Sequence, residues 1–365
     1  MKIAMVGARG VGNQYSGIET HLEELCPRLV GKGHEVTVFA RSYFTLAKEY
    51  KGVRVVRLPT IRTKHLDTLV HSFIATMAAI WSDADVVHFH ALGPSLFAPI
   101  PKAVGRRVVV TVHGLDWQRE KWGRLASWWL RRGEHTSATV PSATIVVSQT
   151  LRDHYRARYP SCNIHYIPNG VTITPPSPPQ EIGRMGLARR GYTLFVGRLT
   201  PEKGCHLLID AYKDLSTERK LVVAGGSAHT DGYVRSLTER GNGRALFLGT
   251  VQKDLLAELY SNAYLFVLPS LVEGLPICLL EAMSHGLCVV ASDIAPNLEV
   301  VDHCGLTFPA GDSYALASVL RDAMAEPDTV LELGCAARER IRHYYNWESI
   351  ADQTEAVYLS ILTSF

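Results

Sequence analysis

The segment from Pro269 to Gly286 lies between two short apolar runs and constrains the fold more than any other part of the chain. The run Tyr264–Leu268 precedes it and Cys288–Ala291 follows it, and both have the composition of buried parallel strands. Gly274 and Pro276 break the chain after the first run, and a proline suits the first turn of a helix. The pattern predicts a strand, a loop, a helix that ends at Gly286, and a second strand.

Two carboxylates occupy special positions in this segment. Glu273 lies in the loop before the predicted helix, and Glu281 follows on the helix, about 12 Å further along its axis at the usual rise per residue. The helix N-terminus between them favours anions. A diphosphate could bind there while the two acids hold hydroxyl groups on either side of it. A nucleotide sugar has that chemistry.

Strands and helices alternate along the chain and predict two parallel, doubly wound α/β domains. A length of 365 residues also favours two domains. Residues 174–180, which read Thr-Pro-Pro-Ser-Pro-Pro-Gln, form a stiff linker. We therefore expect an N-terminal domain over 1–172 and a C-terminal domain over 173–346.

Composition narrows the class of protein. The chain is 47% hydrophobic and 20% charged, as in globular enzymes, and its apolar runs fall short of the ~18 residues of a membrane span. Its 7 cysteines are scattered, which predicts reduced thiols and a cytoplasmic location. Residues 1–170 contain 22 Lys and Arg against 12 Asp and Glu, whereas the remainder contains 16 against 23. The basic N-terminal half should face an anionic partner.

Several polar residues lie where strands are predicted to end, which is where open α/β sheets bind ligands. His113 follows the strand Val108–Val112, with Asp116 and Arg119 as weaker candidates nearby. Arg198 and Lys203 lie in the loop after the strand Tyr192–Val196.

Three patterns give weaker signals. Gly7, Gly10 and Gly12 are spaced differently from a dinucleotide fingerprint, so we expect a flexible loop near a phosphate or an acceptor. Asp83 and Asp85 match the D-x-D tripeptide of metal-dependent transferases but precede a strand, at the wrong end of the sheet. His88 and His90 share one strand face, although the sequence nearby offers no third metal ligand.

The spacing of Glu273 and Glu281 resembles the E-x7-E motif of retaining glycosyltransferases with the GT-B fold, specifically glycosyltransferase family 4. The segment 197–204, Gly-Arg-Leu-Thr-Pro-Glu-Lys-Gly, resembles the diphosphate-binding loop of that family, and His113-Gly114 resembles its site beside the transferred sugar. The resemblance covers nearly the whole chain. It implies two Rossmann-like domains that face a cleft, with the acceptor on the first, the nucleotide sugar on the second, and a C-terminal helix over 347–365 that crosses back to the first.

The resemblance also implies roles for individual residues. Arg198 and Lys203 would neutralise the diphosphate, Glu281 would hold the ribose, Glu273 the sugar hydroxyls, and His113 would contact the sugar; these cations make a metal unnecessary. The donor would also be contacted by Gly17, Gly225, Val251, Gly274, Leu275 and Pro276.

The sequence is compatible with several sugar donors and with two other functions. UDP-hexoses and UDP-N-acetylhexosamines are the commonest donors of the family, and a similarity to bacterial polysaccharide enzymes adds dTDP-rhamnose. A nucleotide-sugar epimerase of the same fold and a non-catalytic nucleotide-sugar-binding protein are the alternatives. We expect no nucleic-acid partner, and the sequence does not indicate an oligomeric state.

Tryptophan and arginine alternate in the N-terminal half between Trp117 and Arg132. The part from Gly123 onward predicts a helix whose aromatic face could lie on an anionic membrane at the inner face of the plasma membrane, or could pack on the sheet. The candidates for the acceptor or membrane face are Glu19, Asp116, Arg119, Arg124, Trp128 and Arg131.

Overall fold

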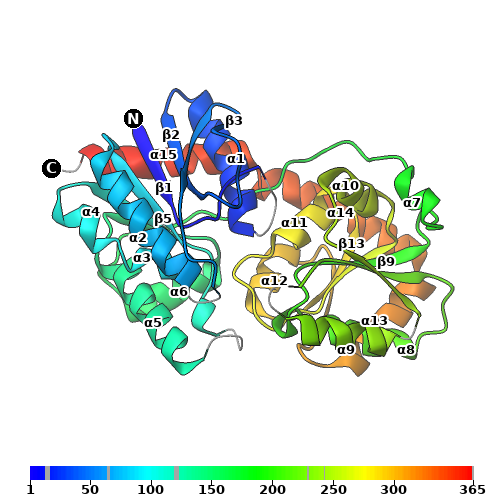
Figure 1. Ribbon diagram of the computed structural model, residues 1–365. Coiled ribbons are helices and arrows are strands. Elements are labelled where there is room, and N and C mark those ends of the chain that lie inside the picture. Colours follow the sequence, from blue (N-terminus) through cyan, green and yellow to red (C-terminus); the bar gives the residue numbers. More distant parts are fainter. Residues whose placement is uncertain (13–16, 64–65, 119–122, 228–229, 242, 364–365) are drawn as a thin grey trace. The chain divides into compact units, whose positions relative to one another are not determined.

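A computed structural model describes residues 1–12, 17–63, 66–118, 123–227, 230–241 and 243–363 (Figure 1). The chain folds into two compact units. The first unit comprises Met1–Gly170 and Trp347–Phe365, and the second comprises Val171–Asn346. Each unit is an α/β layered structure built around its own sheet.

The first unit contains an eight-stranded sheet in the order β3-β4-β2-β1-β5-β6-β7-β8. All neighbouring strands are parallel except β3 and β4, which pair antiparallel at one edge. The sheet is therefore mixed, and the prediction of a parallel sheet is correct except at this edge. The strands are β1 Lys2–Val6, β2 Glu35–Arg41, β3 Glu49–Tyr50, β4 Val53–Leu58, β5 Val86–His90, β6 Arg107–Val112, β7 Ala143–Val146 and β8 Ile164–Tyr166.

Helices cover both faces of this sheet, as the alternation of patterns predicts. On α1 the apolar residues Leu22, Leu25 and Leu29 recur at helical spacing and are all fully buried. The helices are α1 Gly17–Gly31, α2 Leu66–Trp81, α3 Leu92–Ser95, α4 Pro99–Ala103, α5 Arg124–Thr139, α6 Gln149–Arg158 and α15 Trp347–Thr363, with a 3-10 turn η1 at Asp116–Gln118.

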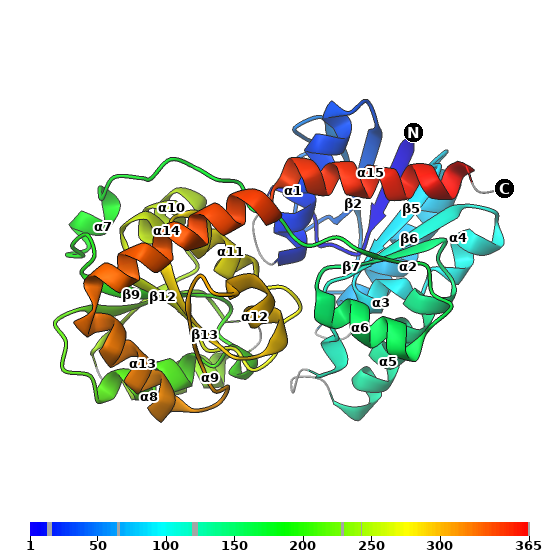
Figure 2. The same ribbon diagram turned by 180° about the vertical axis from the view of Figure 1, so that it is seen from behind.

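The C-terminal helix α15 belongs to the first unit, although it follows the whole of the second in sequence. Figure 2 shows it beside α1, and its Trp347 and Tyr358 are buried in the same core as α1. The Tyr358 hydroxyl lies 2.6 Å from His88 Nδ1, and His88 Nε2 lies 2.7 Å from the Thr111 hydroxyl. His88 is therefore a core histidine with both ring nitrogens hydrogen-bonded.

The second unit contains a six-stranded, wholly parallel sheet in the order β11-β10-β9-β12-β13-β14. The direction in which strands are added reverses between β9 and β12, so the switch point lies between these two strands. Open parallel sheets bind ligands outside the carboxyl ends of the strands at such a point. The strands are β9 Tyr192–Val196, β10 Lys220–Ala224, β11 Ala245–Gly249, β12 Leu265–Leu268, β13 Cys288–Ser292 and β14 Leu306–Phe308.

The helices of the second unit again lie on both faces of its sheet. They are α7 Glu181–Arg184, α8 Cys205–Lys213, α9 Asp231–Gly241, α10 Lys253–Asn262, α11 Ile277–Ser284, α12 Ala295–Val301, α13 Ser313–Ala325 and α14 Pro327–Tyr344, with a 3-10 turn η2 at Pro201–Lys203. Among the described residues of both units, the helices lack the combined length and apolar character needed to cross a membrane.

The D-x-D tripeptide lies at the amino edge of the first sheet. Asp83 forms an ion pair with the Lys2 ammonium, and Asp85 Oδ2 accepts a 2.7 Å hydrogen bond from the Lys2 backbone. Both acids therefore help to join the starts of β1 and β5, on the side opposite the strand ends where ligands bind.

Candidate functional site

Two loops meet at the switch point of the second unit. The loop Gly197–Gly204 follows β9, and the loop Pro269–Pro276 follows β12. Leu271 N donates a 2.8 Å hydrogen bond to Glu202 O. Gly204 has a φ of 68°, and a Cβ there would lie 1.9 Å from Pro269 O. The two loops are thus held together by backbone contact that tolerates no side chain at Gly204.

An ion pair joins the same two loops through their side chains. Lys203 Nζ lies 2.5 Å from Glu273 Oε1, and the Ser270 hydroxyl donates to that oxygen at 2.7 Å. The side chains of Lys203 and Glu273 are only 14% and 8% exposed. Lys203 and Glu273, for which the family resemblance implies roles at the diphosphate and at the sugar, are therefore ion-pair partners.

The N-terminus of α11 follows immediately. The helix starts at Ile277, one residue after the start that the sequence predicts. Pro276 is its N-cap in an extended conformation, and this cap has no side-chain hydrogen bond. Gly274, Leu275 and Pro276 are buried. A proline cap offers no side-chain acceptor, so Pro276 leaves the N–H groups at the start of α11 uncapped by its own side chain, and the helix N-terminus carries partial positive charge. This arrangement suits a phosphate group.

Glu281 lies on α11 and accepts a hydrogen bond from a residue that the sequence did not single out. The Tyr260 hydroxyl on α10 donates to Glu281 Oε2 at 3.0 Å, and the Tyr260 ring stacks on His285 with centroids 5.6 Å apart. Burial raises the pKa of the Tyr260 phenol well above its usual value, so it remains a donor. A tyrosine on the apolar face of a helix carries no sequence signal beyond core packing.

The remaining donor-binding candidates lie at neighbouring strand ends. Gly225 N donates to Gly249 O at 2.8 Å, and a Cβ at Gly225 would lie 1.8 Å from Gly197 O. Val251 is partly buried just beyond β11. Arg198 is partly buried in the loop after β9, and its neighbour Leu199 donates to Gly226 O at 3.0 Å. The ends of β9, β10 and β11 thus lie near the loops Gly197–Gly204 and Pro269–Pro276.

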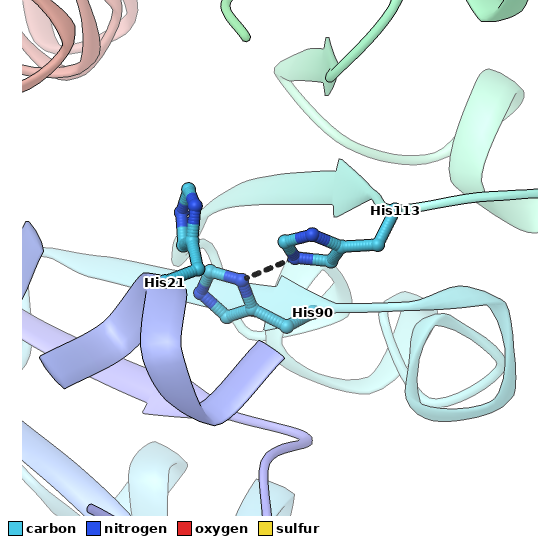
Figure 3. Close-up of side chains that lie close together, drawn as sticks. All are labelled: His21, His90 and His113. Atoms are coloured by element: carbon cyan, nitrogen blue, oxygen red, sulfur yellow. Dashed lines mark hydrogen bonds between the residues drawn. The ribbon is translucent and has the colours of Figure 1, made fainter. Parts of the chain in front are cut away.

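The first unit gathers three histidines at the carboxyl ends of its central strands (Figure 3). His113 follows β6, His90 ends β5, and His21 comes from α1. His90 Nδ1 lies 3.2 Å from His113 Nε2, and the ring centroids of His21 and His113 are 5.0 Å apart. His21 carries no sequence signal, because its position on α1 has the spacing of a core residue.

All three imidazoles are neutral at pH 7. Burial lowers the pKa of His21 to about 4 and lowers the pKa values of His90 and His113 well below the usual value. Neighbouring histidines lower both pKa values further: His88, His113 and His21 act on His90, and His21 and His88 act on His113. A neutral imidazole offers one N–H donor and one lone pair.

The glycine loop lies beside this cluster. A Cβ at Gly7 would lie 2.5 Å from His90 O. The buried carboxylate of Glu19 accepts from Arg9 N at 3.0 Å, so its structural role is to hold this loop. Gly17 is exposed at the first position of α1, while the segment 13–16 lies outside the described residues.

The candidates for the acceptor or membrane face lie on η1 and α5. Asp116 is partly buried in η1, and Arg119 lies outside the described residues. Arg124, Trp128 and Arg131 are exposed on α5. No ligand or membrane contact tests these assignments, and they stay predictions, as do those for the second unit.

Replacing Gly204 tests whether loop contact maintains the site. Gly204→Ala should lower the melting temperature and weaken nucleotide binding at least tenfold, because the new Cβ would collide with Pro269 O and separate the loops. Gly243→Ala is the matched control: Gly243 has a similar φ of 75° but open space around its Cβ position. Thermal denaturation and calorimetric titration measure both effects, and equal behaviour of the two variants would contradict the account.

Two family models match the chain in sequence order. "Glycosyltransferase Family 4" matches residues 15–174, and "Glycosyl transferases group 1" matches residues 187–340. An alpha-maltose-1-phosphate synthase from Mycobacterium tuberculosis is 30% identical over 335 residues, which cover 81% of this chain and 84% of the relative. A GDP-mannose-dependent alpha-(1-6)-phosphatidylinositol monomannoside mannosyltransferase from the same species is 28% identical, with 92% of each chain covered.

Solved structures agree on the fold. Sucrose-phosphate synthase from Thermosynechococcus elongatus superposes with a TM-score of 0.86 at 22% identity, with both chains fully covered. Anabaena HepE in complex with UDP-glucose superposes with a TM-score of 0.83 at 21% identity, covering 99% of this chain and 100% of that one. The chain therefore belongs to the family 4 glycosyltransferases and has their GT-B fold of two Rossmann-like units.

Proposed function

We propose that this glycosyltransferase moves a sugar from a nucleoside diphosphate to an acceptor hydroxyl with retention of anomeric configuration, in bacterial polysaccharide or glycan synthesis. The second unit binds the donor and the first binds the acceptor. The observation that carries the proposal is the convergence of Lys203, Glu273 and the uncapped N-terminus of α11 at the switch point of the second sheet.

The contact between Lys203 and Glu273 indicates how the proposed site would hold a donor. A diphosphate competes for the ammonium and is stabilised by it, by Arg198 and by the N–H groups of α11. Glu273 then exchanges its cationic partner for the sugar hydroxyls. During transfer, negative charge grows on the leaving phosphate oxygen, and the same groups neutralise it, so the reaction needs no metal ion.

The other donor contacts follow from the geometry of α11. Glu281 holds the ribose hydroxyls, with Tyr260 fixing one of its oxygens at 3.0 Å. His113, a neutral imidazole, contacts the transferred sugar as donor or acceptor of a hydrogen bond.

We infer a UDP-hexose or a UDP-N-acetylhexosamine as donor, with dTDP-rhamnose as a further candidate. The complexes of Anabaena HepE with UDP and with UDP-glucose support a nucleotide-sugar donor. The name of the mannosyltransferase relative adds GDP-mannose to the donors that a screen should contain.

A transfer assay tests the function. Glu281→Ala and Arg198→Ala should each reduce transfer at least about tenfold, the scale of one lost charge-stabilising contact. Arg235→Ala and Glu239→Ala, which truncate exposed residues of α9, are the matched controls and should retain wild-type rates. EDTA should leave wild-type activity intact, whereas loss in EDTA and recovery with Mn²⁺ would contradict the metal-free mechanism.

The products of the same incubation separate the alternatives. Transfer gives a glycosylated acceptor, an epimerase gives the free epimer of the donor, and a binding protein returns the donor unchanged. Wild-type rates in both the Glu281 and Arg198 variants would contradict the site assignment.

A surface of α5 supports a membrane-linked acceptor. Leu125, Trp128 and Trp129 are 72%, 49% and 44% exposed, so these side chains do not pack on the sheet as one reading of the sequence expects. Arg132 lies over the Trp128 ring at 5.2 Å. With the C-terminal helix included, the first unit contains 22 basic and 15 acidic residues, a net charge of +7.

We propose that this face of α5 lies on an anionic lipid surface, where tryptophan sits among the headgroups and arginine is attracted to the negative charge. The acceptor is then a lipid-linked glycan, and the enzyme works as a peripheral protein at the cytoplasmic face of the membrane.

Cosedimentation with anionic liposomes tests this contact. Wild-type protein should bind vesicles at low ionic strength and dissociate as salt screens the attraction. Replacing Arg124, Arg131 and Arg132 by Glu should abolish binding. The control replaces Arg54, Arg57 and Lys102, which are exposed elsewhere on the first unit, by Glu. This variant should retain most of the vesicle binding. Equal loss in both variants would indicate an effect of net charge alone, and no wild-type binding would contradict the proposal.

A further inference from the structure

The histidine cluster of the first unit has the composition and geometry of a metal site. One ring nitrogen from each of His21, His90 and His113 lies within 4.8 Å of the other two. The 3.2 Å between His90 Nδ1 and His113 Nε2 is close to the edge of about 3.3 Å that two nitrogens span on a tetrahedral zinc ion with bonds of about 2.0–2.1 Å. The third nitrogen, from His21, lies within 4.8 Å of both and would approach them by up to about 1.5 Å to complete three corners of a tetrahedron.

The surroundings prepare the rings for this role. Asn169 Oδ1 lies 3.0 Å from His21 Nδ1 and can only accept, so the proton of His21 is on Nδ1 and its Nε2 carries the lone pair. Hydrogen bonds of this kind from ligating histidines to an oxygen orient the ring toward a metal. The His88 ring is tilted against that of His90, with centroids 4.2 Å apart, but hydrogen bonds to Tyr358 and Thr111 occupy its nitrogens and exclude it from the ligand set.

The Nδ1 lone pair of His90 is available to a cation. His90 is fully buried, and its Nε2 has no hydrogen-bond partner among the residues that the structure describes, so nothing there fixes the ring proton away from Nε2. With the proton on Nε2, the lone pair of Nδ1 faces His113 Nε2, and a cation between these two atoms would replace their 3.2 Å contact. His113 is only half-buried, which gives an ion access to the cluster from solvent.

We propose that His21, His90 and His113 bind one divalent transition-metal cation, and that Zn²⁺ fits best. Three imidazoles suit Zn²⁺, Co²⁺ or Ni²⁺, whereas Mg²⁺ and Ca²⁺ prefer oxygen ligands. Three protein ligands leave a fourth position for water. Resting on the proposed function, the consequence is inhibition: a coordinated His113 has lost the lone pair and the freedom to contact the donor sugar, so the cation competes with the donor.

Direct binding to the full chain tests the site. After removal of metals with a chelator, equilibrium dialysis against ZnCl₂ should give one Zn²⁺ per chain. His21→Gln and His90→Gln should each weaken binding at least tenfold, the scale expected for a lost ligand. His135→Gln removes an exposed imidazole of the same unit, and Cys335→Ser removes the exposed thiol; both should bind like the wild type.

X-ray absorption of the zinc-loaded wild type identifies the zinc ligands directly. It therefore tests the site even if the variants at the buried positions His21 and His90 misfold. Three imidazole nitrogens and one oxygen around zinc are expected. Sulfur ligands, fewer than three imidazoles, or binding that survives His90→Gln in a folded protein would overturn the site and leave the 3.2 Å contact as a plain hydrogen bond.

Transfer kinetics separate the site from its consequence. Zn²⁺ should inhibit transfer with the midpoint found by dialysis, raise the KM for donor, and be reversed by EDTA. Zinc bound to the three histidines without any effect on transfer would overturn the inhibition and keep the site. Stoichiometric zinc binding by a protein that transfers no sugar to any acceptor would contradict the proposed function and leave the site standing.

Discussion

The ion pair between Lys203 and Glu273 is the interaction on which the proposed donor site depends. It joins the loops after β9 and β12 across the switch point of the second sheet, and both partners are largely withdrawn from water. Removing one partner would leave a poorly solvated charge, which is strongly destabilising. In the proposed function, a diphosphate that pairs with Lys203 would therefore act on a contact that also joins the two loops.

The two units use the same architectural position for opposite chemistry. In the second unit, the strand ends carry a paired cation and anion beside an uncapped helix N-terminus. Such an environment favours phosphate binding. In the first unit, the strand ends carry three neutral histidines, held in that state by burial. Neutral imidazoles can hydrogen-bond hydroxyl groups or coordinate a transition metal. At His113 each of these two uses would exclude the other.

Much of the fold follows from local sequence, because continuous apolar runs bounded by Gly, Pro and polar residues define parallel strands. The predicted strand Tyr192–Val196 agrees with the structure residue for residue, and the predictions Val108–Val112 and Cys288–Ala291 differ by one residue from β6 and β13, respectively. The two-residue strand β3 is not predicted from the sequence, because two residues are too few to give a periodic pattern. Motif residues could be placed at strand ends, but His21 and Tyr260 could not, since only tertiary packing brings helix residues to those ends.

The most direct test of the proposed donor site in the second unit is backbone hydrogen exchange with and without a saturating nucleoside diphosphate. The account predicts slower exchange of backbone amides in 197–204 and in the first turn of α11, because the loop and the helix N-terminus contact the phosphates. Lys203→Ala should diminish both effects, since the lysine anchors the ligand. Tight nucleotide binding with unchanged exchange in both segments would contradict the central claim that the diphosphate lies at the switch point of the second sheet.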